Sequence, residues 1–291
     1  MTTRSPLISA EALLELVRSG RPGLRIVDCR WVLGQPGAGA SAYAAGHLPG
    51  AIHVDLDTDL ADPAGHGAPG RHPVPSPAAF AATLGLAGIG DGDLVVAYDD
   101  VGGWVAARLW WMLDVLGHPD VAVLDGGVAA WQAAGGQLTT DEPVPTPAEL
   151  HLAEIWSGVI DRDELKARLG SVRLLDARVG PRYRGETEPI DPVAGHIPTA
   201  LNAPVDGNLV ESNGRFRPAP ELAARFRELG ADGSAGPVVT SCGSGVSALH
   251  HALALRAAGL PDPILYVGSY SDWSRSGEPV ATGPEPGAPP A

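Results

Sequence analysis

The sequence predicts two homologous α/β domains, each a mostly parallel sheet flanked by helices. Its 291 residues are about twice the usual domain length of ~150 residues. Motifs of the first half recur in the same order in the second half, which indicates a duplicated domain. Short β-branched segments alternate with helical segments, and this alternation is typical of a parallel sheet covered on both faces.

Four pairs of segments carry the internal repeat. They are residues 24–30 with 172–178, 46–49 with 195–198, 94–99 with 237–242, and Gly126 and Trp131 with Gly268 and Trp273. The partners lie 142 to 149 residues apart and keep their order.

The repeat sets the expected domain boundaries. We expect an N-terminal domain over residues 1–140 and a C-terminal domain over residues 152–282. Three prolines between them favour an extended linker over residues 141–151. The proline-rich residues 283–291 offer little to bury, so a disordered tail is predicted there.

Each copy is expected to follow one order of elements. A helix comes first, capped by Ser9 or by Asp161, and Asp161 with Glu164 has the form of a capping box. A strand ending in Asp-x-Arg and a Gly-His-x-Pro loop follow. A second strand leads through a glycine-rich turn to a helix, predicted over residues 246–258 in the second copy. A third strand, at 121–124 or 264–267, precedes a helix with a tryptophan, and ligands are expected beyond the carboxyl ends of the strands.

Composition and charge exclude several classes of function. A net charge of −14 and a pI of about 4.9 argue against a nucleic-acid binder, which needs a basic face. The apolar runs are far shorter than the ~18–20 residues of a membrane span. Residues 1–20 carry acidic side chains in an amphipathic pattern and so resemble a helix more than a signal peptide. A cytoplasmic protein with reduced thiols is expected.

We expect neither a metal nor a cofactor. Two cysteines, Cys29 and Cys242, cannot build a disulfide framework or a four-cysteine metal site. His66 and His72 follow several aspartates, but their spacing matches no standard set of metal ligands. That glycine- and proline-rich stretch is interpreted as a solvated loop.

Cys242 is the candidate nucleophile. It ends a predicted buried strand, and residues 243–247, Gly-Ser-Gly-Val-Ser, precede a helix. The two glycines allow a tight turn with inward-pointing N–H groups, and the helix N-terminus adds partial positive charge. Both effects stabilise a thiolate and an anionic sulfur bound to it. The alternative is that Cys242 is a small buried apolar residue, the commonest role of a free cysteine.

Three other positions restrict this chemistry. The first copy has Asp99 where the second has Cys242, so only the second domain is expected to be catalytic. Cys29 also ends a strand, but no glycine turn follows it, and we assign it no chemical role. A cysteine-dependent phosphatase needs an arginine six positions after its cysteine, where this chain has Ala248. Phosphatase chemistry is therefore disfavoured.

Taken together, the motifs resemble the tandem-domain sulfurtransferases of the rhodanese superfamily, over about residues 5–282. Residues 242–247, Cys-Gly-Ser-Gly-Val-Ser, are similar to the Cys-Gly-Ser-Gly-Val-Thr loop of 3-mercaptopyruvate sulfurtransferases. Thiosulfate-using rhodaneses typically have Cys-Arg-Lys-Gly-Val-Thr instead. Further matching signatures lie at residues 28–31, 46–49, 176–178, 182–185 and 195–198.

This resemblance implies an enzyme that works in two half-reactions. The Cys242 thiolate takes a sulfane sulfur from a small anionic donor, and a thiol or cyanide then removes it from the persulfide. The amides of Gly243, Gly245, Val246 and Ser247 would hold the anionic sulfur. 3-Mercaptopyruvate is the favoured donor and thiosulfate the alternative. A further alternative is a persulfide carrier for a protein acceptor, and the acidic surface would suit a basic partner.

The resemblance also implies roles outside the loop. Arg182 matches an arginine that binds the anionic group of the donor. Ser244 matches a serine proposed to polarise the donor, with His47 as its proposed partner. His196 shares the motif of His47, which favours a structural turn role for both. Trp31 matches an aromatic residue that lines the pocket, and its alternative is core packing.

One departure from the family pattern bears on the donor. The mercaptopyruvate enzymes usually carry a second arginine about nine residues after the first. Nine residues after Arg182 this chain has Asp191. An acidic side chain at that point weakens the case for a carboxylate-bearing donor.

Overall fold

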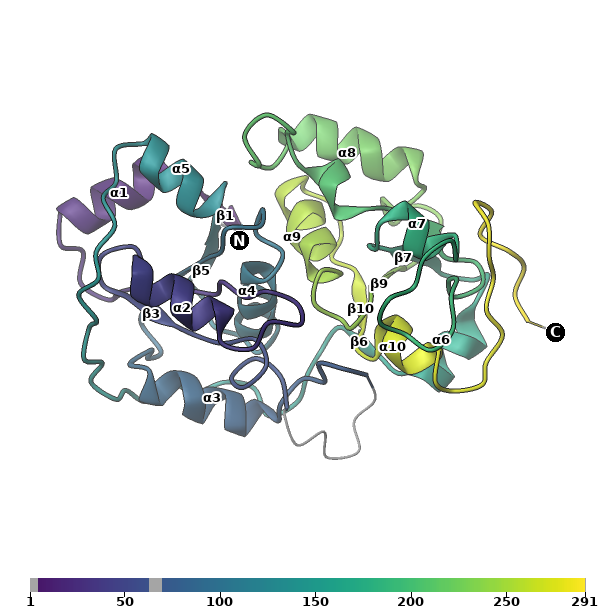
Figure 1. Cartoon of the computed structure of the whole chain (residues 1–291), viewed down its shortest axis with the longest axis horizontal. Helices are drawn as coiled ribbons and strands as arrows, with labels where there is room; N and C mark the ends of the chain where they lie inside the picture. The colour runs from purple at the N-terminus through teal and green to yellow at the C-terminus, as the bar shows by residue number, and fades with distance from the viewer. Residues whose placement is uncertain (1–4, 63–69, 291) are drawn as a thin grey trace. The chain divides into compact units, whose positions relative to one another are not determined.

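The computed structural model describes residues 5–62 and 70–290, which form two compact units (Figure 1). The first unit holds residues 5–62, 75–157 and 210–216. The second unit holds residues 70–74, 158–209 and 217–290. Residues 70–74 therefore pack with the second unit, although most of the first unit follows them in the chain.

Each unit contains a parallel five-stranded sheet. The first has the strand order β1-β5-β4-β2-β3 and the second the order β6-β10-β9-β7-β8, so the two sheets correspond strand by strand. The strands of the first unit are β1 (Leu7–Ile8), β2 (Leu24–Asp28), β3 (Ala51–His53), β4 (Leu94–Tyr98) and β5 (Val121–Leu124). Those of the second are β6 (Val159–Ile160), β7 (Arg173–Asp176), β8 (Leu201–Asn202), β9 (Val238–Ser241) and β10 (Ile264–Tyr266).

Helices flank both sheets, which confirms the predicted fold class. The first unit contains α1 (Ala10–Arg18), α2 (Ala38–Ala45), α3 (Pro77–Leu86), α4 (Ala106–Val115) and α5 (Gly127–Ala133). The second contains α6 (Arg162–Arg168), α7 (Gly180–Tyr183), the 3₁₀ helix Val205–Asn208, α8 (Ala219–Glu228), α9 (Leu249–Ala257) and α10 (Ser269–Trp273). In Figure 1, α1 and α5 lie side by side, as do α8 and α9. No helix of the described residues is long and apolar enough to cross a membrane.

The central strands position the site. Every residue of β4 and of β9 is buried, because a strand in the middle of a covered parallel sheet has no face toward water. Asp99 follows β4 and Cys242 follows β9, so the two aligned residues stand at the carboxyl edges of their sheets. This is the edge at which open α/β sheets bind ligands.

Side-chain caps begin the first helix of each unit, as predicted. Ser9 Oγ accepts the Ala12 N–H at 3.2 Å, and Asp161 Oδ1 accepts the Glu164 N–H at 2.8 Å. The Glu164 carboxylate pairs with Arg168 at 3.0 Å and not with the Asp161 N–H. Of the two hydrogen bonds of the expected capping box, the one from the Glu164 N–H to Asp161 is therefore formed.

Two hydrogen bonds join the last residues to the rest of the second unit. Gly283 N–H donates to the Arg184 carbonyl at 2.9 Å, and the carbonyl of Pro286 accepts the Thr199 N–H at 2.6 Å. These hydrogen bonds fix two points of the segment, and the disordered tail expected over residues 283–291 stays a prediction. Prolines lack an N–H donor, but their carbonyls still accept hydrogen bonds.

His251, on the buried face of α9, makes folding stability depend on pH. It is fully buried, its Nδ1 lies 3.1 Å from Thr240 Oγ1, and burial lowers its pKa from 6.5 to about 3. The unfolded chain therefore binds one more proton than the folded chain between about pH 6.5 and 3. The contribution of His251 to the free energy of unfolding is fully present above pH 6.5, and it falls by up to ~1.4 kcal/mol for each pH unit below pH 6.5.

The matched variant is His251→Gln, which removes the titrating group. Denaturant unfolding at pH 7 and pH 5 should show a stability loss for the wild type that exceeds the loss for the variant by about 2 kcal/mol. Equal losses for the two proteins would contradict this assignment.

Candidate active site

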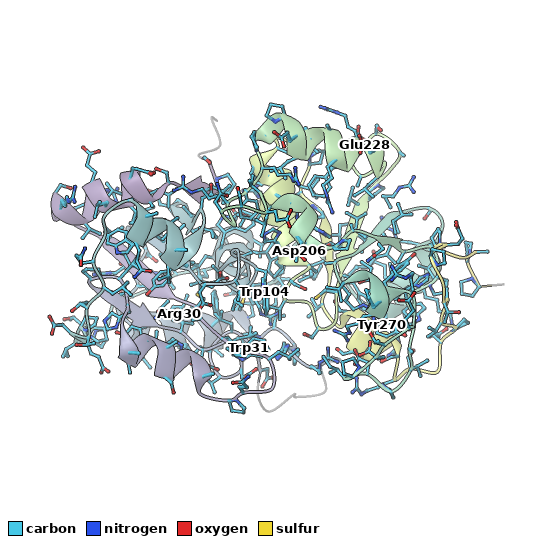
Figure 2. All side chains as sticks on the ribbon, turned by 45° about the horizontal axis from the view of Figure 1, so that its top comes forward. Arg30, Trp31, Trp104, Asp206, Glu228 and Tyr270 are labelled. Carbon is cyan, nitrogen blue, oxygen red and sulfur yellow. The ribbon has the colours of Figure 1, made fainter. Side chains whose placement is uncertain are left out.

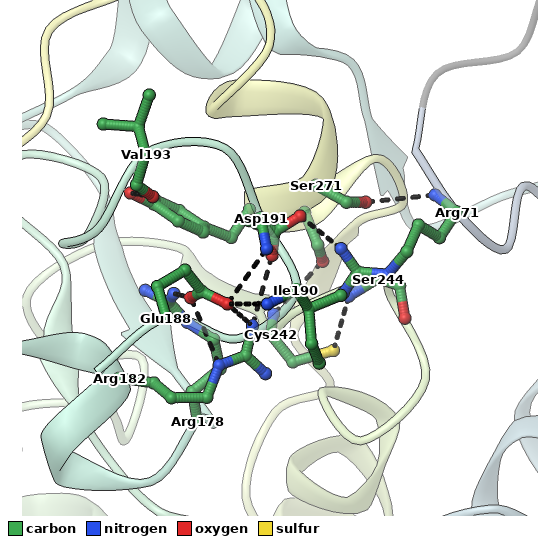
Figure 3. A network of polar contacts seen from close by, with 12 residues as sticks. Arg71, Arg178, Arg182, Glu188, Ile190, Asp191, Val193, Cys242, Ser244 and Ser271 are labelled. Atoms are coloured by element: carbon green, nitrogen blue, oxygen red, sulfur yellow. Dashed lines mark hydrogen bonds and ion pairs between the residues drawn. The ribbon is translucent and has the colours of Figure 1, made fainter. Parts of the chain in front are cut away.

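Cys242 lies in a loop whose amides face its sulfur. Its side chain is buried, and Sγ accepts the Ser244 N–H at 3.4 Å (Figure 3). Sγ also accepts the Gly245 N–H at 3.1 Å. Gly245 has a φ of +76°, and a Cβ there would lie 2.4 Å from the Val267 carbonyl oxygen. Only glycine fits this turn, and the turn aims the amides at the sulfur.

The rest of the loop leads into α9. Carbonyls of Val246 and Ser247 accept the N–H groups of Leu249 and His250 at 3.0 and 3.1 Å. The helix begins at Leu249, three residues later than predicted, because residues 243–248 form the turn around Cys242. Partial positive charge at the start of α9 adds to that of the loop amides.

The backbone of Cys242 is held by a strained serine. Ser269 has a φ of +49°, in a region that residues other than glycine rarely adopt. Its Oγ accepts the Cys242 N–H at 3.1 Å. The same hydroxyl donates to the Tyr266 carbonyl at 2.9 Å. At the matching position of the first unit stands Gly127, with a φ of +54°. The second unit thus keeps the backbone conformation and adds a hydroxyl that fixes the cysteine.

Ser269→Gly should slow the chemistry of Cys242 without weakening the fold. Losing one hydrogen bond to the Cys242 backbone is expected to lower kcat about 2- to 10-fold. The thermal midpoint should change little, because glycine relieves the positive-φ strain. Initial rates and thermal unfolding of the variant measure the two effects. An unchanged rate would show that the hydroxyl does not position Cys242.

Ser244 has a histidine partner that the sequence did not predict. Its Oγ lies 2.8 Å from Nδ1 of His72, and both side chains are buried. The interpretation of this stretch as a solvated loop is therefore wrong for His72, whereas His66 lies outside the described residues. Among the described residues, no group of His, Cys, Asp and Glu could hold a metal ion.

His47 is held in a turn of the first unit, and its proposed pairing with Ser244 stays a prediction. In the first unit, Nδ1 of His47 lies 2.8 Å from the Tyr43 carbonyl oxygen and Nε2 lies 3.2 Å from that of Asp141. His196 repeats the arrangement in the second unit, with carbonyl oxygens of Tyr183 and Glu285 at 2.8 and 3.1 Å. Both rings also stack on a tyrosine. The motif therefore builds a turn, as its recurrence had indicated.

Arg182 lies beside the cysteine loop and pairs with carboxylates. It is at the end of α7, and its Nη1 is 3.5 Å from the point where a Cβ on Gly243 would lie. Nη2 binds Glu188 Oε1 at 2.7 Å and Asp191 Oδ2 at 3.2 Å. Burial alone would raise the pKa of Glu188, but hydrogen bonds from Arg182 and the Asp191 amide outweigh it and hold that pKa below its usual value.

Asp191 collects three guanidinium groups. Its side chain is inaccessible to solvent and binds Arg182, Arg71 and Arg275, the last at 3.1 Å (Figure 3). We call these four residues, with Glu188, the Asp191 cluster. Within this cluster three guanidinium groups face two carboxylates, so it carries a net positive charge. Asp191, expected to disfavour a carboxylate-bearing donor, thus gathers cations beside the Cys242 loop.

Arg178 braces the end of β7. Its Nη2 binds Asp176 at 2.6 Å at the end of β7, and the Gly195 carbonyl at 2.8 Å. The guanidinium carbon lies 3.8 Å from the centre of the Tyr270 ring. This cation–π contact helps to hold the Arg178 guanidinium at the end of β7.

The first unit has an anion in the matching loop. The buried Asp99 carboxylate accepts N–H groups at 2.8–3.0 Å from Val101, Gly103, Val105 and Ala106. Burial raises the pKa of Asp99 above its usual value, against the effect of these donors. The loop of this fold is therefore an anion cradle, and in the first unit its own side chain fills it.

Cys29 and Trp31 are packed within the first unit. Burial raises the pKa of the Cys29 thiol well above its usual value, and neighbouring carboxylates raise it further, so this thiol stays protonated. Trp31 Nε1 donates to Asp57 Oδ2 at 2.8 Å, and its ring meets Trp104 edge-on at 6.1 Å (Figure 2). Trp31 is thus part of this unit's packing, and a pocket-lining role for it stays a prediction.

Comparisons with known proteins agree with this geometry. The Rhodanese-like domain family matches residues 9–134 and 161–276. The chain is 46% identical to a probable 3-mercaptopyruvate sulfurtransferase of Pseudomonas aeruginosa, covering 95% of this chain and 98% of that protein. It is 41% identical to a putative thiosulfate sulfurtransferase, SseB, of Mycobacterium tuberculosis, over 92% and 93% of the two chains. The solved structure of the 3-mercaptopyruvate sulfotransferase SseA from Escherichia coli matches with a TM-score of 0.78 and 31% identity, over 92% of this chain and all of that one.

Proposed function

The chain belongs to the rhodanese-like family of sulfurtransferases, and from this premise we propose that it transfers sulfur from 3-mercaptopyruvate through a persulfide on Cys242. The pair of amide N–H groups on Sγ is the observation that carries this proposal. A cradle of donors suits a thiolate before transfer and an anionic persulfide after it. The second unit is then the catalytic domain, and the first provides the filled copy of the same cradle.

The first half-reaction breaks the carbon–sulfur bond of the donor. The Cys242 thiolate attacks the donor sulfur, the bonding electrons stay on the carbon, and the thiol proton ends on that carbon. A thiolate and mercaptopyruvate thus become a persulfide anion and pyruvate. In the second half-reaction cyanide or a small thiol attacks the outer sulfur, and the Cys242 thiolate returns as the leaving group. Cyanide yields thiocyanate.

Ser244 and His72 are placed to assist the first half-reaction. A developing negative charge on the donor's oxygen needs a hydrogen-bond donor, which the Ser244 hydroxyl supplies. His72, at 2.8 Å from that hydroxyl, can hold or return its proton. A buried serine–histidine pair therefore suits a donor with a carbonyl group, which thiosulfate lacks.

The choice of donor rests on the loop and on Arg182. Gly243 and Ser244 bring no charge into the cradle, so the donor's anionic group has to be held by arginines beside it. Arg182 is one such group, and its fork of N–H donors fits a carboxylate. Thiosulfate remains the alternative donor.

The cytoplasmic location stays a prediction from the sequence.

Rates with the two donors test this proposal. With cyanide as the common acceptor, kcat/KM for 3-mercaptopyruvate should exceed that for thiosulfate by at least about tenfold, or ~1.4 kcal/mol of transition-state stabilisation. A preference for thiosulfate would contradict the assigned donor. Negligible turnover with both, together with a stable persulfide on Cys242, would favour a sulfur carrier for a protein acceptor.

A further inference from the structure

Residues 70–72 are fixed on the second unit at three points, one of which is in the Cys242 loop. The first is Gly70, whose φ is +94° and whose Cβ, if present, would lie 2.8 Å from the Gly268 carbonyl oxygen. The Arg71 N–H donates to Ser271 Oγ in α10 at 3.0 Å, and His72 contacts Ser244. Such close backbone packing commits this segment to the site in the second unit.

The Arg71 side chain ends next to the cysteine loop. Its Nη1 forms an ion pair with Asp191, and its Nη2 lies 2.9 Å from the point where a Cβ on Gly243 would be. Arg182, which also binds Asp191, has its Nη1 3.5 Å from the same point. Since Gly243 has no side chain, two guanidinium groups share the space above the loop (Figure 3).

One donor of Arg71 is buried and unused. Among the described residues none accepts a hydrogen bond from its Nε, although that atom is hidden from solvent. Leaving a buried N–H of a charged group unpaired is costly, so such an atom beside a reactive loop indicates a missing anionic partner.

We propose that Arg71 is the second guanidinium of the donor site and that Asp191 is the positioning residue that holds it over Gly243. This inference rests on the proposed function. Arg71 and Arg182 together would grip the oxygen face of the donor's anionic group, the carboxylate of 3-mercaptopyruvate or the sulfonate end of thiosulfate. Arg71 then takes the place of the arginine that the family pattern expects at position 191, and Asp191 holds Arg71 there.

The test is the steady-state kinetics of Arg71→Gln and Arg71→Lys with both donors and cyanide as acceptor. Arg71→Gln should raise KM about 10- to 100-fold with a smaller change in kcat, because it removes a contact made in the ground state as well as in the transition state. The KM of Arg71→Lys should lie between those of the wild type and Arg71→Gln, since lysine keeps the positive charge but loses the fork of N–H donors. A larger rise for 3-mercaptopyruvate assigns the carboxylate, and a larger rise for thiosulfate assigns the sulfonate.

The matched control is Arg256→Gln, which removes an arginine that pairs with Asp262 at 2.6 Å on the same unit. It should leave both KM values unchanged, and thermal unfolding checks that all variants are folded. If the wild type transfers sulfur and the KM values of Arg71→Gln and Arg71→Lys lie within twofold of its own, the role of Arg71 is overturned. The proposed function would then still stand. No transfer by the wild type from either donor would overturn the proposed function as well.

Discussion

Cys242→Ser is expected to abolish sulfur transfer, with kcat/KM for thiocyanate formation lowered by ~10³-fold or more. An alkoxide at this position cannot form a persulfide, and serine is a poor nucleophile without an activating base. The fold should be kept, because the Ser244 and Gly245 amides can donate to a hydroxyl oxygen as they do to Sγ. Thiocyanate production and thermal unfolding of the variant measure the two parts of this expectation.

Cys29→Ala is the matched control. This thiol is buried in the first unit, and its pKa is raised by burial and by neighbouring carboxylates. Activity should stay within about twofold of the wild type, since a protonated buried thiol is a weak nucleophile. Retained activity in Cys242→Ser, or its complete loss in a folded Cys29→Ala protein, would place the chemistry elsewhere.

Gly245→Ala is expected to lower both activity and stability. The left-handed φ of +76° costs about 1 kcal/mol for alanine, and the Cβ at 2.4 Å from the Val267 carbonyl oxygen forces the backbone to move at a further cost of ~1–3 kcal/mol. The Gly245 N–H would leave Sγ, which removes a charge-assisted hydrogen bond. We expect kcat to fall about 10- to 100-fold. Denaturant unfolding and steady-state rates measure the two losses.

Gly259→Ala separates crowding from backbone strain. Gly259 follows α9 with a φ of +71°, and a Cβ there would have open space around it. This variant should lose only about 1 kcal/mol and keep full activity. If Gly245→Ala behaved in the same way, the contact with Val267 and the role of the Gly245 amide would both be disproved.

Much of the fold could be predicted from the sequence because the domain occurs twice. Matching segments in the same order show which apolar runs are equivalent, and a run such as Leu94–Tyr98, buried on both faces, is typical of a central parallel strand. The start of α9 was placed too early, since periodicity cannot separate a tight turn from the first turn of a helix. The hydrogen bonds of Gly283 and Pro286 cannot be predicted from composition, because their partners, Arg184 and Thr199, lie far away in the sequence.

The candidate site could be predicted only where its chemistry is local in sequence. Cys242 and its glycines form one continuous motif, so their geometry follows from the strand end and the turn. His72 and Arg71 reach the site because residues 70–74 pack with the second unit, and no spacing or periodicity encodes that contact. Asp191 was interpreted by its charge alone, whereas its role follows from the three arginines that it binds.

The mass of the Cys242 peptide tests the central claim most directly. The protein is treated with 3-mercaptopyruvate without an acceptor, digested under non-reducing conditions and analysed by mass spectrometry. We predict the gain of one sulfur atom on the peptide with Cys242, no gain on the peptide with Cys29, and loss of the added sulfur after cyanide is supplied. An unmodified Cys242 in protein that produces pyruvate, or sulfur on Cys29 instead, would contradict transfer through a Cys242 persulfide.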